Sequence, residues 1–125
     1  MKYITKISGV TFENRQNVIK KLKIGDKISL EKDINNFFDV YAIKIMFKNE
    51  MLGYIEKKHS EFFNKIFNRI KEVKVENILR GEKGIIGVRI CIFIITLNCR
   101  KCGREYIKKE NALKCCEKDK INNWR

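Results

Sequence analysis

The sequence predicts a mostly β protein, namely a small antiparallel barrel with two inserted helices and a short C-terminal appendage. Several short stretches alternate apolar and polar residues, which is the period of a strand with one buried face. Few of the connections between them are long enough for parallel crossovers, and only two stretches have helical spacing. With 125 residues and 44% hydrophobic content, the chain can form one core and a small extension. We therefore expect a domain over residues 1–97 and a tail over residues 98–125.

The first half of the chain contains four predicted strands and one short helix. The strands, identified by alternating apolar positions, are residues 2–10, 27–31, 42–47 and 51–55. The last two flank a short polar turn and are expected to pair as a hairpin. The helix covers residues 17–22, because Val18, Ile19 and Leu22 share one helical face and Gly25 begins a turn after them.

The segment at residues 36–45 places two adjacent aromatics and a carboxylate, Phe37, Phe38 and Asp39, directly before a strand. Two interpretations fit these residue types. The rings form either a hydrophobic plug whose Asp39 caps a turn, or a stacking platform whose Asp39 hydrogen-bonds a ligand. The residues alone leave both open.

The second half begins with a predicted helix over residues 56–72. Its apolar positions recur at helical spacing, and we expect them to pack in the core: Phe62, Phe63, Ile66, Phe67 and Ile70. Two further strands are predicted over residues 73–79 and 85–97, separated by a glycine-containing turn. Cys91 lies within the second of these strands and is expected to be a buried thiol.

The formal net charge of +13 is spread over both parts of the chain. Such a charge attracts polyanions, nucleic acid first and anionic membrane second, although lysine-rich surfaces also arise without a ligand. There is no apolar run of about 18 residues and no N-terminal signal peptide pattern, so we expect a soluble cytoplasmic protein. One histidine, no paired carboxylate motif and no G-x4-G-K-[ST] loop predict that the protein is not an enzyme.

The tail carries the other cysteines in a pattern typical of zinc-ribbon proteins. Cys99 and Cys102 form a C-x2-C-Gly knuckle, and Cys115 and Cys116 follow after a 12-residue spacer. Four thiolates would suit tetrahedral Zn²⁺, so a zinc-ribbon-like appendage is predicted. Because neighbouring side chains tend to diverge, Asp119 or His59 could replace one thiolate. The alternative is a set of reduced cysteines without metal.

Three stretches in this order resemble the HIRAN domain: GVTFENRQ at 9–16, NFFDVYAIKI at 36–45, and LGYI at 52–55 followed by a helix. The resemblance covers roughly residues 3–96. It implies an oligonucleotide-binding-like or SH3-like barrel, either as a free-standing bacterial or phage protein or as a module of DNA translocases. In the translocases the module holds the 3′ end of single-stranded DNA, which is the function that the resemblance implies here.

The resemblance also implies roles for individual residues. Phe12 and Phe38 occupy the two aromatic positions that sandwich the terminal base, and Asp39 the carboxylate that contacts the 3′ hydroxyl. Lys57 falls at a phosphate-contacting position. Arg15 and Tyr54, within the first and third motifs, complete the predicted nucleic-acid-binding set. The chain departs from the family pattern at Phe37, where a proline is usual, and at Phe12 and Phe38, where animal members have tyrosine.

The sequence therefore predicts a non-enzymatic module that binds single-stranded nucleic acid and prefers the 3′-hydroxyl end of DNA, with RNA as an open alternative ligand. A DNA-processing ATPase or nuclease is the expected class of partner. The alternative function is a zinc-containing adaptor between proteins. Membrane binding is not expected, because the chain lacks a basic amphipathic helix with Trp or Leu anchors.

Overall fold

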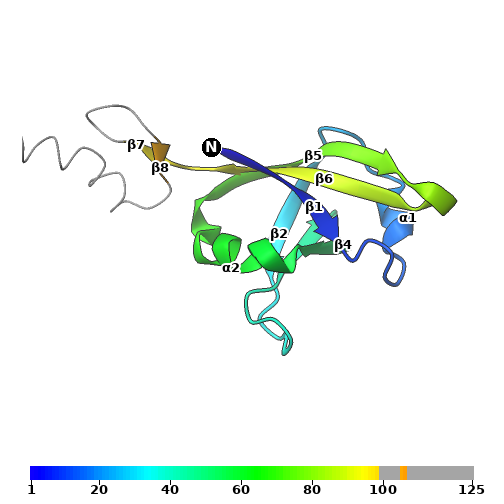
Figure 1. Cartoon of the computed structure of the whole chain (residues 1–125), viewed down its shortest axis with the longest axis horizontal. Coiled ribbons are helices and arrows are strands. Elements are labelled where there is room, and N and C mark those ends of the chain that lie inside the picture. Colours follow the sequence, from blue (N-terminus) through cyan, green and yellow to red (C-terminus); the bar gives the residue numbers. More distant parts are fainter. Residues whose placement is uncertain (99–104, 107–125) are drawn as a thin grey trace, which may run out of the picture.

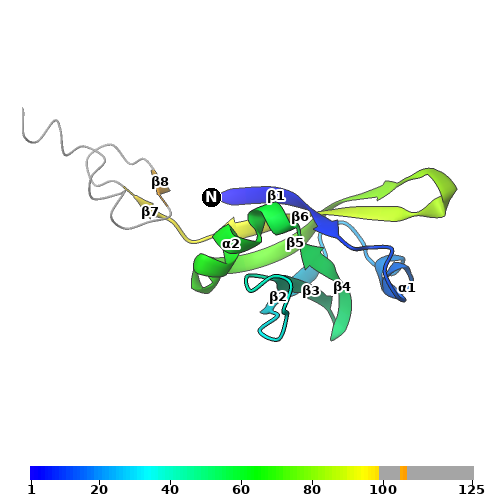
Figure 2. The same cartoon turned by 60° about the horizontal axis from the view of Figure 1, so that its bottom comes forward.

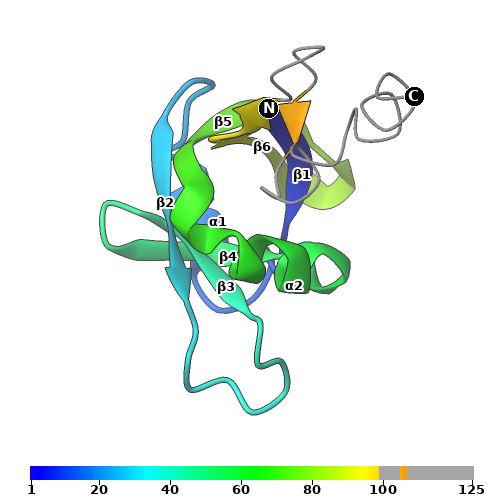
Figure 3. The same ribbon diagram turned by 90° about the vertical axis from the view of Figure 1, so that its left-hand side faces the viewer.

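The computed structural model describes residues 1–98 and 105–106 of the chain. Six antiparallel strands close into a barrel in the order β1-β4-β3-β2-β5-β6, and β6 pairs back with β1. Figure 3 shows the strands arranged as a ring. The strands are β1 (Lys2–Ser8), β2 (Lys27–Lys32), β3 (Ile43–Phe47), β4 (Glu50–Ile55), β5 (Ile70–Arg80) and β6 (Ile86–Ile94). The predicted mostly β barrel with two helices is confirmed.

Two α-helices and two short 3₁₀ turns interrupt the strands, and a small ladder follows the barrel. The helices are α1 (Arg15–Ile19) and α2 (Lys57–Lys65), and the 3₁₀ turns are η1 (Phe67–Arg69) and η2 (Glu82–Gly84). The ladder pairs β7 (Leu97–Asn98) with β8 (Glu105–Tyr106). Figure 2 shows the long β5–β6 hairpin extending past the rest of the barrel. Within the described residues, no helix is long and apolar enough to cross a membrane.

The barrel interior is filled by the inward-facing residues that alternation predicts. Ile43, Ile45, Leu52, Ile90 and Ile92 have no exposed surface. Burying each such side chain contributes about 1.5–3 kcal/mol relative to leaving it in water. Cys91 is also buried as a free thiol, as expected. Closure leaves no open sheet edge in the barrel, so its loops project from a rigid scaffold.

The predicted helix over residues 56–72 was too long, because α2 ends at Lys65. Ile70 begins β5 instead, because it pairs opposite Ile94 in β6. A register shift between Ile70 and Glu72 then brings Val73 and Val75 into strand alternation. Phe62 was also wrongly placed in the core. It is 39% exposed, while its neighbour Phe63 is 2% exposed.

Other boundaries differ by a few residues for local reasons. The first strand ends at Ser8, because Gly9 adopts a φ of +74° and begins a turn. The first helix was predicted over residues 17–22 but spans Arg15–Ile19. Leu22 lies in the turn after the helix, and its side chain is buried there. The strand predicted over residues 85–97 ends at Ile94. The division between residues 97 and 98 stays a prediction.

Candidate nucleic-acid interface

The loop between β2 and β3, residues 33–42, projects from the barrel (Figures 1 and 3). It exposes large apolar side chains. Phe37 is 96% and Phe38 is 95% exposed, and Ile34 and Val40 are 85% and 75% exposed. The rings therefore do not plug the barrel. They are held in water on a loop, which removes the first of the two interpretations that the sequence left open.

Side-chain hydrogen bonds give this loop a defined shape. The Asn36 Oδ1 atom accepts from the backbone N–H groups of Phe38 at 2.9 Å and Asp39 at 3.0 Å. Asp39 in turn accepts from the Tyr41 N–H through Oδ1, at 2.9 Å. Such side-chain-to-backbone bonds are typical of Asx turns. Asp39 thus caps a turn, as in the plug interpretation, while the rings beside it remain exposed.

Two further bonds fasten the loop to α2. The Ser60 hydroxyl donates to Asp39 Oδ2 at 3.1 Å, and the Asn64 amide donates to the Tyr41 carbonyl at 3.2 Å. A carboxylate offers about four acceptor positions, so Asp39 keeps acceptor capacity after binding Tyr41 and Ser60. The carboxylate is half-buried and fixed from two sides, which is a suitable geometry for contacting a ligand hydroxyl.

At the base of the loop, Asp33 connects it to the barrel wall. Its Oδ2 accepts from the Tyr54 hydroxyl at 2.8 Å, and its Oδ1 lies 3.9 Å from Lys44 Nζ. The pKa of the Tyr54 phenol is raised above its ordinary value of 10.0, first by burial and then by the hydrogen bond to Asp33, both of which favour the neutral form. Tyr54 therefore stays a hydrogen-bond donor at neutral pH.

The Arg15 side chain is buried and packs against the Phe12 ring, so its charge does not face solvent. It is 8% exposed, and its Nη1 donates to the Gly9 carbonyl at 2.8 Å. Its guanidinium carbon lies 5.3 Å from the centroid of the Phe12 ring and 5.5 Å from that of Tyr54. These are cation–π distances. Phe12 itself is 63% exposed, so one face of its ring is free.

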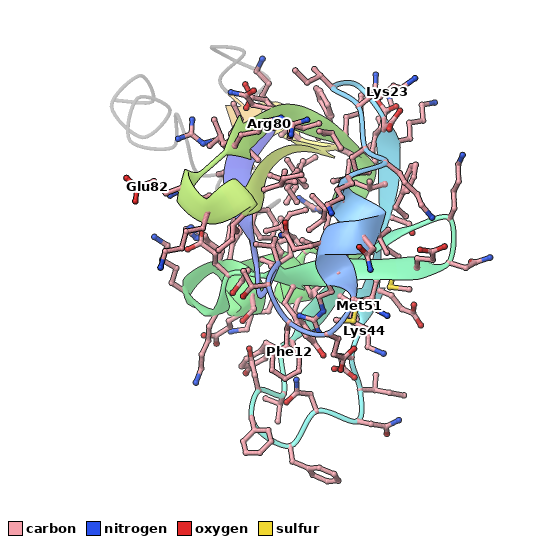
Figure 4. All side chains as sticks on the ribbon, turned by 90° about the vertical axis from the view of Figure 1, so that its right-hand side faces the viewer. Phe12, Lys23, Lys44, Met51, Arg80 and Glu82 are labelled. Atoms are coloured by element: carbon pink, nitrogen blue, oxygen red, sulfur yellow. The ribbon has the colours of Figure 1, made fainter. Side chains whose placement is uncertain are left out.

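The predicted residues thus form two groups on one side of the barrel. Arg15 contacts both Phe12 and Tyr54, and Tyr54 reaches the loop through Asp33. In Figure 4, Phe12 lies on the side of β3 and β4 from which the loop projects. Asp39 and the exposed Lys57 form the second group, because the single Ser60 hydroxyl lies within hydrogen-bond distance of both the Asp39 carboxylate and the Lys57 backbone carbonyl.

Sequence reasoning missed Asp33 and Ser60, which hold the loop in place. Asp33 follows the alternation of β2 and precedes Asn36 by three residues, a spacing that indicates a turn but not the contact with Tyr54. Ser60 lies inside an amphipathic helix, where its contacts with Asp39 and the Lys57 carbonyl leave no sequence pattern. Phe37 was identified as one of the two loop aromatics but was not included in the binding set.

The predicted zinc ligands Cys99, Cys102, Cys115 and Cys116, and the substitute Asp119, lie outside the described residues. Among residues 1–98 and 105–106, no three His, Cys, Asp or Glu side chains are grouped as a metal site. His59 instead lines a small cavity between α2 and β1.

Two solved structures share this fold. The HIRAN domain of human HLTF aligns with a TM-score of 0.56 and 16% identity, covering 96% of this chain and 87% of that one. A protein from Lactobacillus plantarum aligns with a TM-score of 0.54 and 13% identity, covering 76% and 100%. Among curated proteins, none matches the chain significantly.

The family comparison covers most of the barrel. The HIRAN domain family matches residues 2–94, which run from the first residue of β1 to the last residue of β6. This match includes all three sequence motifs and both groups of predicted binding residues. The chain therefore belongs to the HIRAN domain family, a family of nucleic-acid-binding modules.

Proposed function

We propose that this protein binds the end of single-stranded nucleic acid by stacking bases on Phe12 and on the exposed rings of loop 33–42. The observation that carries the proposal is that Phe37 and Phe38 are almost fully exposed on a loop that hydrogen bonds hold in shape. Stacking of a base on an aromatic ring contributes about 1–3 kcal/mol and tolerates any base. The rings gain nothing from core packing, so a ligand accounts for their presence.

Asp39 and Lys57 support a preference for a 3′-hydroxyl end of DNA. An ionised carboxylate only accepts hydrogen bonds, so it favours a free hydroxyl and repels a terminal phosphate. Lys57 is exposed on the first turn of α2, near Asp39 through Ser60, where it can contact the next phosphate. RNA ends offer the same hydroxyl, and a DNA-processing ATPase or nuclease is the class of partner that such a module would serve.

Asp39→Asn tests the end preference. The substitution removes the charge but keeps an oxygen that can accept from the Tyr41 N–H, so the turn should survive. We expect the ratio of affinities for 3′-hydroxyl and 3′-phosphate oligonucleotides to fall toward one, measured by fluorescence anisotropy with 5′-labelled strands. Wild-type protein that binds both ends equally would contradict end recognition, while general single-strand binding could still hold.

Ser60→Ala is the matched control for this experiment. It removes a hydroxyl that holds Asp39 without changing any charge. Losing one such hydrogen bond weakens the tether by about 1 kcal/mol. The affinities for both ends should then fall together and their ratio should stay as in wild type. A changed ratio in this variant would mean that loop geometry, not the Asp39 charge, selects the end.

Docking of a protein partner is the competing function, because exposed apolar patches also mark protein interfaces. Ile34 and Val40 allow the two functions to be distinguished, since both are exposed on the same loop but cannot stack on bases. Replacing both with serine should leave oligonucleotide affinity within about twofold, whereas Phe37→Ala/Phe38→Ala should reduce it strongly. If the aliphatic variant loses a co-purifying protein and the aromatic variant binds DNA normally, the adaptor function is correct.

We also propose that Cys99, Cys102, Cys115 and Cys116 bind one Zn²⁺, which their thiolate chemistry and spacing support. Cys102→Ser should lower the zinc content measured by elemental analysis. Cys91→Ser is the control, because Cys91 is a buried barrel residue and its replacement should leave zinc unchanged. Metal-free wild-type protein after purification under reducing conditions would contradict the site.

A further inference from the structure

A second basic surface lies on the outside of β1 and β6, next to the start of α2. It surrounds a shallow cavity of about 320 Å³ lined by the cations Lys6, Lys58 and Arg89, with His59 and Glu56 at its edge. Lys6 and Arg89 are directly opposite each other in the β1–β6 ladder, and both are exposed. The residues before and after Lys6, Thr5 and Ile7, point inward and are buried.

Placing like charges directly opposite on one sheet face destabilises the pair unless an anion lies between them. Among the residues that the structure describes, no carboxylate forms an ion pair with Lys6 or Arg89. The nearby Glu56 is already engaged, with Lys58 Nζ at 3.6 Å and the Thr5 hydroxyl at 3.5 Å. The cavity therefore keeps an excess of positive charge that the fold does not neutralise.

The other cross-strand pair of like charges in the barrel has an internal counterion. Lys27 and Lys74 are opposite each other between β2 and β5, and Glu72 bridges them at 3.5 Å and 3.6 Å. The barrel thus contains one like-charge pair with an internal counterion and one without. Departures from local rules of this kind are expected where a ligand supplies the missing group.

The first turn of α2 connects this cavity to the loop. Glu56, at the start of α2, contacts β1 through Thr5, and Ser60, one turn later, contacts loop 33–42 through Asp39. Figures 1–3 all show α2 between β1 and this loop. Lys57 and Lys58 are adjacent on that turn, so positive charge continues from the loop side to the cavity side.

We propose that the phosphodiester backbone of the bound strand continues from Lys57 over the first turn of α2 and occupies the cavity between Lys6 and Arg89. This inference rests on the proposed function, because it assigns the path of the same strand away from its end. A phosphate bound in the cavity would supply the missing negative charge. The strand would then be held by a stacking site at its end and by a purely electrostatic site beyond the phosphate at Lys57.

Lys6→Gln/Arg89→Gln tests the path with a DNA dinucleotide, which has a single phosphodiester, and with DNA of about 12 nucleotides, both carrying a free 3′ hydroxyl. Losing two phosphate contacts should make the slope of log K against log[salt] shallower by about 1.4 for the longer strand. If the two lines meet at about 1 M salt, the variant should bind this strand about 25-fold more weakly than wild type at about 0.1 M salt. The shorter strand should bind both proteins within about twofold, because it does not reach the cavity.

Lys27→Gln/Lys74→Gln is the matched control, because it removes the same charge from the pair that Glu72 already bridges. Equal losses in the two variants would mean that net charge alone acts, and would overturn the path. An equal loss with the short strand would overturn it as well. The Lys6/Arg89 variant should also melt at or above the wild-type temperature, since it relieves repulsion.

The length series separates this inference from the proposed function. Wild-type protein that binds the short strand but gains nothing from a longer one would contradict the path alone. If Phe12→Ala/Phe38→Ala leaves binding of the short strand unchanged, the stacking site fails, whatever the longer strand shows.

Discussion

Phe12→Ala/Phe38→Ala should weaken binding of single-stranded oligonucleotides by about 2–6 kcal/mol, or roughly 30-fold or more, if each ring contributes one stacking interaction. Both rings are largely exposed, so their removal creates no cavity and should not reduce the free energy of unfolding appreciably. The measurement is an anisotropy titration, combined with thermal unfolding of the same samples.

Ile24→Ala/Ile85→Ala is the control for this result. Both residues are exposed apolar side chains, on other turns of the barrel, so the variant loses apolar surface without losing a stacking partner. Its oligonucleotide affinity should equal that of wild type. Loss of cooperative unfolding in the ring variant, with unchanged binding per folded molecule, would show that the rings are structural.

Gly53→Ala should destabilise the barrel by about 4 kcal/mol, enough to unfold a marginally stable domain. Gly53 lies in β4 where β1 crosses closely, with a φ of +157°. A Cβ there would overlap the Ser8 carbonyl oxygen and lie 2.6 Å from Ile7 Cγ2. Since the contact involves backbone, β1 would have to move away from β4 and the barrel would open. Chemical denaturation of both proteins measures this fall in the free energy of unfolding.

Gly25→Ala separates this clash from the cost of a positive φ. Gly25 has a φ of +92°, but a Cβ at that position would meet nothing within 4 Å. The free energy of unfolding of this variant should therefore fall by only about 1 kcal/mol, because alanine disfavours the positive φ. Equal destabilisation of the two variants would show that β1 and β4 tolerate the added methyl group.

Most of the barrel could be predicted from the sequence, because alternation directly reports which strand residues face the core. Ile43 and Ile45 illustrate this, since both were placed inward by their period and both are fully buried. The end of α2 could not be predicted in the same way. Ile70 fits the helical spacing of the preceding phenylalanines and lies three residues before Val73, which does not match a strand period. Only its pairing opposite Ile94 in β6 decides that it belongs to a strand.

The candidate site was partly predictable for a different reason. Adjacent aromatics and a carboxylate before a strand indicate a loop that can bind a ligand. Whether the rings are exposed, however, depends on whether other residues already fill the barrel core. The burial of Arg15 and the role of Asp33 depend on contacts between segments far apart in sequence, such as Asp33 with Tyr54. No local pattern records such contacts.

The salt dependence of binding tests the central claim most directly, because stacking releases no counterions whereas each phosphate contact contributes a slope of about −0.7 on single strands. Lines of log K against log[salt] for wild type and Phe12→Ala/Phe38→Ala should be parallel and offset. The preference of wild type for single-stranded over duplex DNA should disappear in the variant. Coincident lines, with duplex competing as well as single strand, would show that this protein is only a basic surface and that the exposed rings do not bind bases.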